Sequence, residues 1–259
     1  MNILRSKKFK LLKGDCFKLM DILIKQGIKF DAIITDPPFG STACSWDNVL
    51  DFSEMWKRLQ QLKKDKSTPV ILFGTEPFSS NLRLSNIYEY KYDLIWVKEK
   101  LTNPFLVKKQ FGRVHENISV FYKKQCTYNP MMSKRDNVTN PKPMKGDLNV
   151  DETNVISGVY KHSLDYNPEL VYPTSILKFN RDGKKGSKAL HPTQKPLALM
   201  EYLIKTFSNE DDLILDFTMG SGTTGVAALK LNRRFVGIEQ NVKYFKIAKN
   251  RINKKLNDE

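Results

Sequence analysis

Short apolar runs alternate with stretches of helical spacing along most of the chain. Residues 30–35 and 70–74 are apolar runs of strand length, whereas residues 51–62 repeat their apolar positions with the period of a helix. On this basis we predict strands at residues 10–12, 30–35, 70–74, 92–97, 118–122, 213–217 and 234–239, and helices at residues 17–24, 51–62, 77–84, 196–207, 224–231 and 242–256. Strands that alternate with helices predict an α/β domain with a parallel or mostly parallel sheet.

Residues 123–188 interrupt this alternation. Asn, Pro, Lys, Asp and Ser dominate the segment, and its apolar residues hold no period for long. We therefore predict an insertion of turns and short strands. The insertion divides the chain into a first half of the α/β domain (residues 1–122), the inserted region (123–188) and a second half (189–259).

Composition suits a globular protein with a polyanionic partner. A chain of 259 residues that is 40% hydrophobic can bury one sizeable core. Its net charge of +15 favours nucleic acid as a partner, although biased use of Lys would give the same balance. We see no secretion signal and no apolar run near the roughly 18 residues of a membrane span, so a soluble, intracellular protein is expected. The three cysteines and three histidines lack metal-ligand spacing, and no metal site is expected.

A glycine-rich turn follows the predicted strand at residues 213–217. Gly220, Gly222 and Gly225 have the GxGxxG spacing, and Glu239 ends the next strand. This layout is typical of sites for adenosine-bearing ligands, where the acid accepts hydrogen bonds from the ribose hydroxyls. Asp216, just before the turn, would oppose a pyrophosphate but suits the cationic amino-acid end of S-adenosylmethionine. An NAD-type oxidoreductase, or a tight turn without a ligand, is the alternative interpretation.

The turn Asp36-Pro37-Pro38-Phe39 follows the predicted strand at residues 30–35. An exocyclic amine of a nucleobase is a poor nucleophile, because its lone pair is delocalised into the ring. It attacks a methyl sulfonium only when acceptors hold it in line with the reacting bond. The Asp36 carboxylate and the Pro37 carbonyl could be such acceptors, and Phe39 could stack on a base flipped out of a duplex. The alternative is a rigid turn in which Asp36 only caps the backbone.

Taken in order, these motifs resemble the β group of DNA amino-methyltransferases, which is circularly permuted. That group has an Asp-Pro-Pro-aromatic turn, a target-recognition insertion and the cofactor loop in this order, and it carries a motif like His191-Pro192-Thr193-Gln194-Lys195-Pro196 before the loop. The resemblance covers nearly the whole chain. It implies the S-adenosylmethionine-dependent methyltransferase fold, with a seven-stranded, mostly parallel sheet and helices on both faces. It also implies base flipping, a role in restriction–modification, and a bacterial or phage-infected cytoplasm.

The resemblance also implies roles for individual residues. Lys195 would bind the methionine carboxylate, Glu239 the ribose hydroxyls, and Asp15 would approach the adenine ring unless it merely caps a helix. The remaining residues of the implied cofactor site are Asp216, Thr218, Gly220, Ser221, Gly222, Thr223 and Thr224. The chain departs from the family where Phe217 and Thr218 replace the usual Pro-Phe after the aspartate, and where Phe39 replaces the commoner Tyr.

Asp36 also bears on the substrate. Asp or Asn before the prolines goes mainly with adenine N6 in this family, and Ser with cytosine N4, so adenine is favoured and cytosine N4 is the alternative. Double-stranded DNA is the implied partner, with Lys98, Lys100 and Arg113 as phosphate contacts. An RNA or protein amide methyltransferase and a non-catalytic DNA-binding protein are further alternatives. Dimers are frequent in the group, which leaves a homodimer open.

Overall fold

The computed structural model describes residues 8–40, 47–135, 169–180 and 194–257. The chain forms two compact units, one from residues 1–129 and 175–259 and the other from residues 130–174. In the smaller unit, β6 (Ser133–Lys134) pairs antiparallel with β7 (Leu170–Val171). All other described helices and strands belong to the larger unit.

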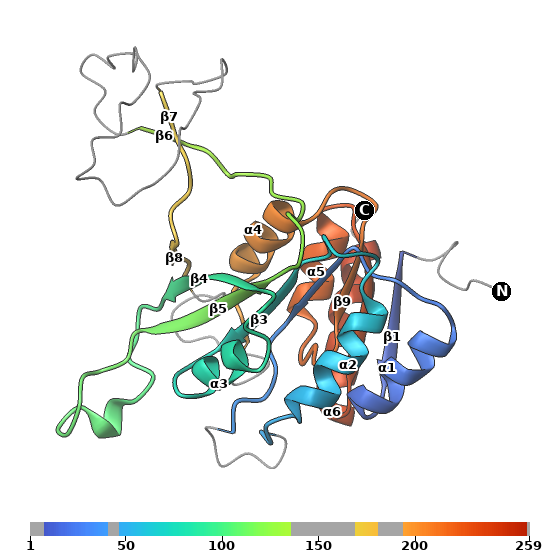
Figure 1. Ribbon diagram of the computed structural model, residues 1–259, viewed down its shortest axis with the longest axis horizontal. Coiled ribbons are helices and arrows are strands. Elements are labelled where there is room, and N and C mark those ends of the chain that lie inside the picture. Colours follow the sequence, from blue (N-terminus) through green and yellow to red (C-terminus); the bar gives the residue numbers. More distant parts are fainter. Residues whose placement is uncertain (1–7, 41–46, 136–168, 181–193, 258–259) are drawn as a thin grey trace. The chain divides into compact units, whose positions relative to one another are not determined.

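An eight-stranded sheet runs through the larger unit in the order β1-β10-β9-β2-β3-β5-β4-β8 (Figure 1). Its strands are β1 (Phe9–Lys13), β2 (Ala32–Thr35), β3 (Val70–Gly74), β4 (Tyr90–Val97), β5 (His115–Phe121), β8 (Ile176–Lys178), β9 (Leu213–Asp216) and β10 (Arg234–Glu239). Neighbouring strands are parallel except where β5 pairs antiparallel with β3 and β4. The mostly parallel α/β fold predicted from the sequence is confirmed.

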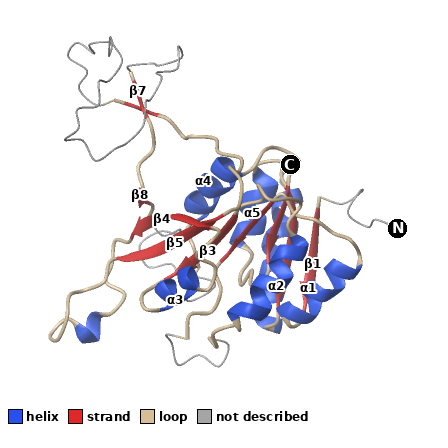
Figure 2. Ribbon diagram, viewed as in Figure 1, coloured by secondary structure: helices blue, strands red, loops and turns tan. Residues whose placement is uncertain are grey.

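Helices cover both faces of this sheet (Figure 2). They are α1 (Cys16–Lys25), α2 (Phe52–Leu62), α3 (Phe78–Leu84), α4 (Leu197–Phe207), α5 (Thr223–Lys230) and α6 (Val242–Asn257). Successive side chains of a strand point to opposite faces, and β2 follows this rule: Ile34 packs in the cluster with α4, α5 and α6, whereas Ile33 packs with α1, α2 and α3. Both faces are therefore dry, which explains why the central strands are continuous apolar runs.

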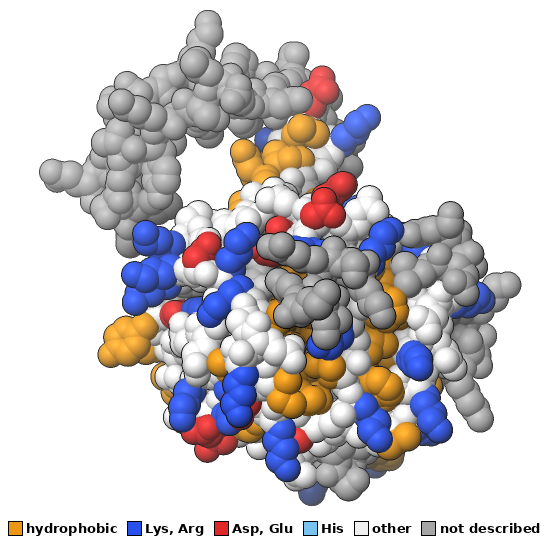
Figure 3. Space-filling view, turned by 90° about the vertical axis from the view of Figure 1, so that its right-hand side faces the viewer, with side chains coloured by type: hydrophobic (Ala, Val, Ile, Leu, Met, Phe, Trp, Pro, Cys, Tyr) orange, Lys and Arg blue, Asp and Glu red, His pale blue; other side chains and the backbone are white. Residues whose placement is uncertain are grey.

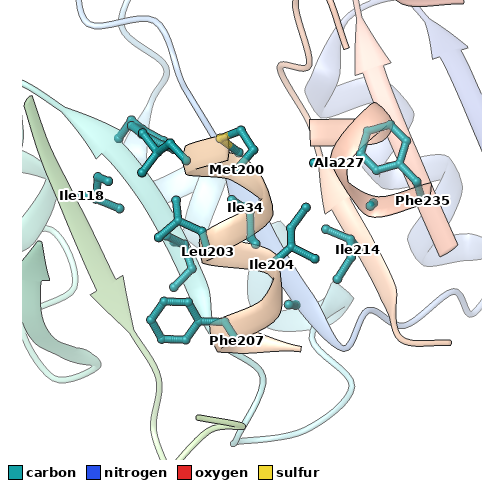
Figure 4. Packing of buried hydrophobic residues seen from close by; sticks show 14 of the residues in the cluster. Ile34, Ile118, Met200, Leu203, Ile204, Phe207, Ile214, Ala227 and Phe235 are labelled. Carbon is teal, nitrogen blue, oxygen red and sulfur yellow. The ribbon is translucent and has the colours of Figure 1, made fainter. Parts of the chain in front are cut away.

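Helix α4 shows how the sequence period becomes packing. Met200, Leu203, Ile204 and Phe207 lie on one side of the helix and contact the sheet around Ile34 (Figure 4). All four are buried. Their spacing of three and four residues is the apolar stripe by which this helix was predicted.

The count of seven strands was wrong by one. The eighth strand, β8, pairs parallel with β4 at the sheet edge, and its residues fall in the range 123–188 that was expected to be an insertion. Only Leu177 of its three residues is buried. A three-residue edge strand with one buried side chain has too little periodicity to be recognised from sequence.

The topology brings the predicted motifs to one edge of the sheet. β2 and β9 are parallel neighbours, so Asp36 and Asp216 lie at adjacent carboxyl ends. From this central pair the sheet extends to β3 on one side and to β10 and β1 on the other. Such a switch point in an open α/β sheet is the usual place for a ligand crevice.

Candidate active site

A cavity of about 1020 Å³ opens at this switch point. Asp36, Pro37, Pro38 and Phe39 line it, together with every predicted cofactor residue except Gly222. Of the predicted DNA contacts, Lys98 and Arg113 line it and Lys100 does not. Ligand pockets usually measure about 300–1,000 Å³, so this cavity is large enough for two small ligands side by side.

The turn that contains Asp36 is held from both sides. The Asp47 carboxylate accepts hydrogen bonds from the backbone N–H groups of Phe39 and Gly40, at 2.8 and 2.9 Å. On the other side, the Thr218 hydroxyl donates to the backbone carbonyl of Asp36 at 3.0 Å. The Phe39 ring packs against Phe78 with 5.0 Å between centroids. The turn is therefore fixed, and Thr218, which departs from the family pattern, joins it directly to the cofactor loop.

A neutral cluster of two carboxylates and two ammonium groups lies beneath this turn. Lys195 Nζ is 2.5 Å from Asp36 Oδ2 and 3.3 Å from Glu116 Oε2, and Lys98 forms an ion pair with Glu116. The side chains of Lys98, Glu116 and Lys195 are each less than 10% exposed. Lys195, expected to bind the methionine carboxylate, thus has two protein carboxylates beside it. Lys98, expected on a DNA-facing surface, is buried instead, because Glu116 compensates its charge.

The cluster leaves Asp36 Oδ1 as an open acceptor. This atom is buried and has no hydrogen-bond partner among the described residues. Burial raises the pKa of Asp36 to about 6, against the opposing effect of the Lys195 charge. Burial would also raise the pKa of Glu116, but the charges of Lys195 and Lys98 outweigh it and hold that pKa below its usual value. Asp36 is therefore a carboxylate at neutral pH with one oxygen available to a ligand.

Three donors of the protein hold the Asp216 carboxylate. Its Oδ1 accepts from the Thr35 hydroxyl at 2.5 Å and from the Thr218 N–H at 3.1 Å, and its Oδ2 accepts from the Thr224 hydroxyl at 2.6 Å. Burial raises its pKa to about 6, while these hydrogen bonds favour the ionised form. The contacts show that Asp216 fixes the start of the glycine-rich turn.

Close packing explains two glycines of the turn. Gly222, at φ +79°, begins α5, and a Cβ there would lie 2.8 Å from the Cβ of Ala248 in α6. A Cβ on Gly225 would lie 2.6 Å from both Ile252 and Phe235. Glycine is thus required for helices and strand to approach one another, as at the helix-packing position of dinucleotide loops. Gly222 supports the cavity wall from behind.

The two outlying acids of the predicted cofactor site also lie at the cavity. Glu239 accepts from the N–H groups of Gly220 and Asn241 at 2.9 and 2.7 Å. Asp15 caps α1 by accepting from the Lys18 N–H at 2.9 Å, and it stays exposed at the cavity rim. Each carboxylate keeps lone pairs for a ligand while it organises the backbone around it.

Comparison with known proteins identifies the family. The sequence model of the N6/N4 family, described as DNA methylase, matches residues 30–250. The chain belongs to this DNA methylase family. It is 27% identical to the Type II methyltransferase M.HpaI of Haemophilus parainfluenzae, over 96% of this chain and 75% of that protein. It is 28% identical to the DNA adenine methyltransferase YhdJ of Escherichia coli strain K12, over 86% of this chain and 76% of that protein.

A solved structure agrees with this assignment. The M1.HpyAVI–SAM complex matches 95% of this chain and 100% of its own, with a TM-score of 0.62 and 27% identity. The protein is thus a DNA methyltransferase of the class that modifies exocyclic amino groups, with S-adenosylmethionine as its cofactor. The oxidoreductase alternative finds no support in these relatives.

The residues present fit this cofactor. The cavity has carboxylates that can accept hydrogen bonds from a ligand, at Glu239 and Asp15, and backbone turns at the glycine loop. Gln194 adds a buried Oε1 without a hydrogen-bond partner among the described residues. The first three residues of the motif that contains Gln194, residues 191–193, lie outside the described residues. Within the described ranges, no cluster of His, Cys, Asp and Glu could hold a metal ion, and no helix is long and apolar enough to cross a membrane.

The number of Lys and Arg side chains does not by itself identify the DNA-facing surface. Figure 3 shows Lys and Arg spread over the face it presents. Lys100 is exposed, whereas Arg113 is half-buried and its N–H donates to Asn103 Oδ1 at 2.6 Å. The position of basic side chains relative to the cavity, rather than the net charge, therefore indicates the DNA-facing surface.

Several site residues were missed in the sequence. Thr35, at the end of β2, was missed; its hydroxyl lies 2.8 Å from the hydroxyl of Thr218, which follows β9. Asp47 was also missed, and it anchors the catalytic turn although it belongs to no motif. From α6, Arg251 donates to the carbonyl of Ser221 at 2.8 Å and to the hydroxyl of Thr223 at 3.1 Å. Thr35 had one usable signal, a polar residue ending an apolar strand. Asp47 and Arg251 had none, because only tertiary contacts distinguish them from surface residues.

Proposed function

We propose that this protein methylates N6 of an adenine that is flipped out of duplex DNA at a specific site. The observation that carries the proposal is Asp36 Oδ1, a buried carboxylate oxygen with no hydrogen-bond partner in the described chain, at the wall of a cavity that also includes the cofactor loop. An exocyclic N–H is a donor that matches this acceptor. Base flipping follows from the position of the turn inside a cavity, which a base still in the stack could not reach.

In the proposed mechanism the protein positions the target amine, stabilises the positive charge that develops on its nitrogen, and accepts the proton that leaves it. Asp36 Oδ1 and the Pro37 carbonyl accept its two N–H bonds, and Phe39 supports the base by stacking. Bound S-adenosylmethionine supplies an electrophilic methyl group. Positive charge that develops on the nitrogen lies beside the Asp36 carboxylate, which is also the nearest base for the departing proton. Lys195 keeps the other Asp36 oxygen engaged, so the carboxylate presents Oδ1 in one orientation.

The choice of adenine rests on Asp36 as the first residue of the turn and on the 28% identity to YhdJ. Two acceptors would serve cytosine N4 equally well, so the base itself must be measured. We expect DNA from cells that express the protein to yield N6-methyladenine on digestion to nucleosides and mass analysis. N4-methylcytosine would replace the proposal with its cytosine counterpart, and modification mapping of the same DNA would give the site.

The rate of methyl transfer should depend on pH through Asp36. Because its pKa is raised to about 6, transfer should slow as pH falls through that region and the carboxylate is protonated. Lys195→Met removes the positive charge that lowers this pKa, so the acidic limb of the rate–pH profile should move to higher pH. Single-turnover rates from pH 5 to 8 measure the shift, and Lys195→Arg, which keeps the charge, is the control. An acidic limb that stays in place in Lys195→Met would mean that Asp36 is not the titrating group.

A further inference from the structure

The connection between β4 and β5, residues 98–114, is a structured loop beyond the ends of those strands (Figure 1). Its two sides are hydrogen-bonded at the base, from the Thr102 N–H to the Arg113 carbonyl at 2.8 Å and from the Asn103 side chain to the Phe111 carbonyl at 3.2 Å. A short 3-10 helix, η1 (Pro104–Leu106), lies at its far end. These contacts hold the loop in one shape.

The loop presents two aromatic rings to solvent. Phe105 is 97% exposed and Phe111 is 98% exposed, the two most exposed large apolar side chains among the described residues. Around them stand Lys100, Lys108 and Lys109, all exposed, while Glu99 is the sole acid between residues 98 and 113. A fixed, basic loop suits a nucleic acid, whose phosphates attract the cations, and an exposed ring near the cavity can contact the flat apolar face of a base.

The two rings differ in their position relative to the cavity. Phe105 is part of the cavity rim, together with Asp36 and Phe39 on the opposite motif, whereas Phe111 is not. A base that enters this cavity leaves a gap in the duplex directly outside its mouth. Phe105 is the most exposed of the large apolar side chains that line the cavity, and an apolar side chain inserted between bases can fill such a gap.

We propose that Phe105 inserts into the base stack in the place of the extruded base, while Lys100, Lys108 and Lys109 contact the flanking phosphates. This inference rests on the proposed function and adds to it a residue that stabilises the flipped state from the DNA side. A second copy of the chain would also cover an apolar surface. The surplus of cations around the rings favours DNA, because two copies of this loop would repel each other.

The test compares Phe105→Ala with Phe111→Ala in single-turnover methylation of a duplex that contains the mapped site. The target base is either paired or placed opposite an abasic position, where extrusion no longer breaks a base pair. Phe105→Ala should slow transfer to the paired target by about 10- to 100-fold, and to the unpaired target by less than about threefold. Phe111→Ala, an equally exposed ring away from the rim, should match the unmodified protein on both duplexes.

Three results would overturn the insertion. The first is an unchanged rate of Phe105→Ala on the paired target, and the second is an equal loss of rate on both duplexes. The third is an unmodified protein that sediments as a dimer while Phe105→Ala sediments as a monomer, because Phe105 would then contact a second copy of the chain. In each of these cases the unmodified protein still methylates the duplex, so the proposed function stands. An unmodified protein that transfers no methyl to either duplex would instead remove the proposed function, and this inference with it.

Discussion

Replacing Asp36 with alanine is expected to slow methyl transfer by about 1000-fold at saturating cofactor and DNA. The substitution removes the open acceptor Oδ1 and leaves the target amine without the carboxylate that opposes its developing charge. Removal of one preorganised electrostatic contact at a reacting atom typically costs about 10²–10³ in rate, and loss of a general base costs about 10²–10⁴. Both losses fall on the same residue here, which places the expectation at the upper end of the first range and within the second.

The fold should tolerate this change. Lys195 keeps Glu116 as a neighbour at 3.3 Å, so no cation becomes isolated when Asp36 is lost. The cofactor contacts proposed for Glu239 and Asp15 lie elsewhere, at the end of β10 and at the N-cap of α1. Calorimetry with S-adenosylmethionine should therefore give an affinity within about threefold of the unmodified protein, since those contacts are unchanged. Single-turnover transfer within tenfold of normal would show that Asp36 is not the base-holding residue.

The pattern of the sequence was sufficient to predict the central fold and both motif-bearing edges. Strands β2 and β9 are buried on both faces, so each is an apolar run that stops at a polar residue, and Asp36 and Asp216 follow from that stop. Parallel strands then place the two acids at one edge whatever the details of the connections. The relative order of the motifs along the chain supplied the rest of the family assignment.

The electrostatic arrangement of the site could not be predicted in the same way. Lys98 follows a strand directly and begins the charged run Lys98-Glu99-Lys100, so a solvated position was the natural expectation. Its burial depends on Glu116, 18 residues further along the chain and brought alongside by the antiparallel pairing of β4 with β5. Lys195 is paired with Asp36 across 159 residues. Such contacts depend on the assembled sheet, and local periodicity contains no information about them.

The glycine-rich turn has features of both kinds, some that the sequence could predict and some that depend on tertiary contacts. Its spacing predicted a strand, a tight turn and a helix in the correct places. The three protein donors that surround the Asp216 carboxylate could not be predicted from that spacing. Thr218 also links the two motifs, because its backbone N–H donates to Asp216 and its hydroxyl donates to the Asp36 carbonyl.

The neutral cluster makes Glu116 a residue whose loss should strongly destabilise the protein. Glu116→Leu removes the carboxylate that contacts both Lys98 and Lys195, whereas the loss of Asp36 leaves Glu116 beside both lysines, whose side chains are 8% and 7% exposed. Removing one partner from a buried ion pair typically costs about 3–5 kcal/mol, because the remaining charge has lost both its water and its counter-charge. The free energy of unfolding in urea should fall by that amount.

A second substitution tests whether charge is the cause. Glu116→Leu combined with Lys98→Met restores neutrality, since one carboxylate and one ammonium group then remain, and it should recover most of the lost free energy of unfolding. Glu201→Leu is the matched control. It breaks the Lys230–Glu201 pair at 2.7 Å, in which the lysine side chain is 48% exposed, and pairs of that kind contribute only about 0–1 kcal/mol. A double variant no more stable than Glu116→Leu alone would mean that lost packing, rather than an uncompensated buried cation, accounts for the instability.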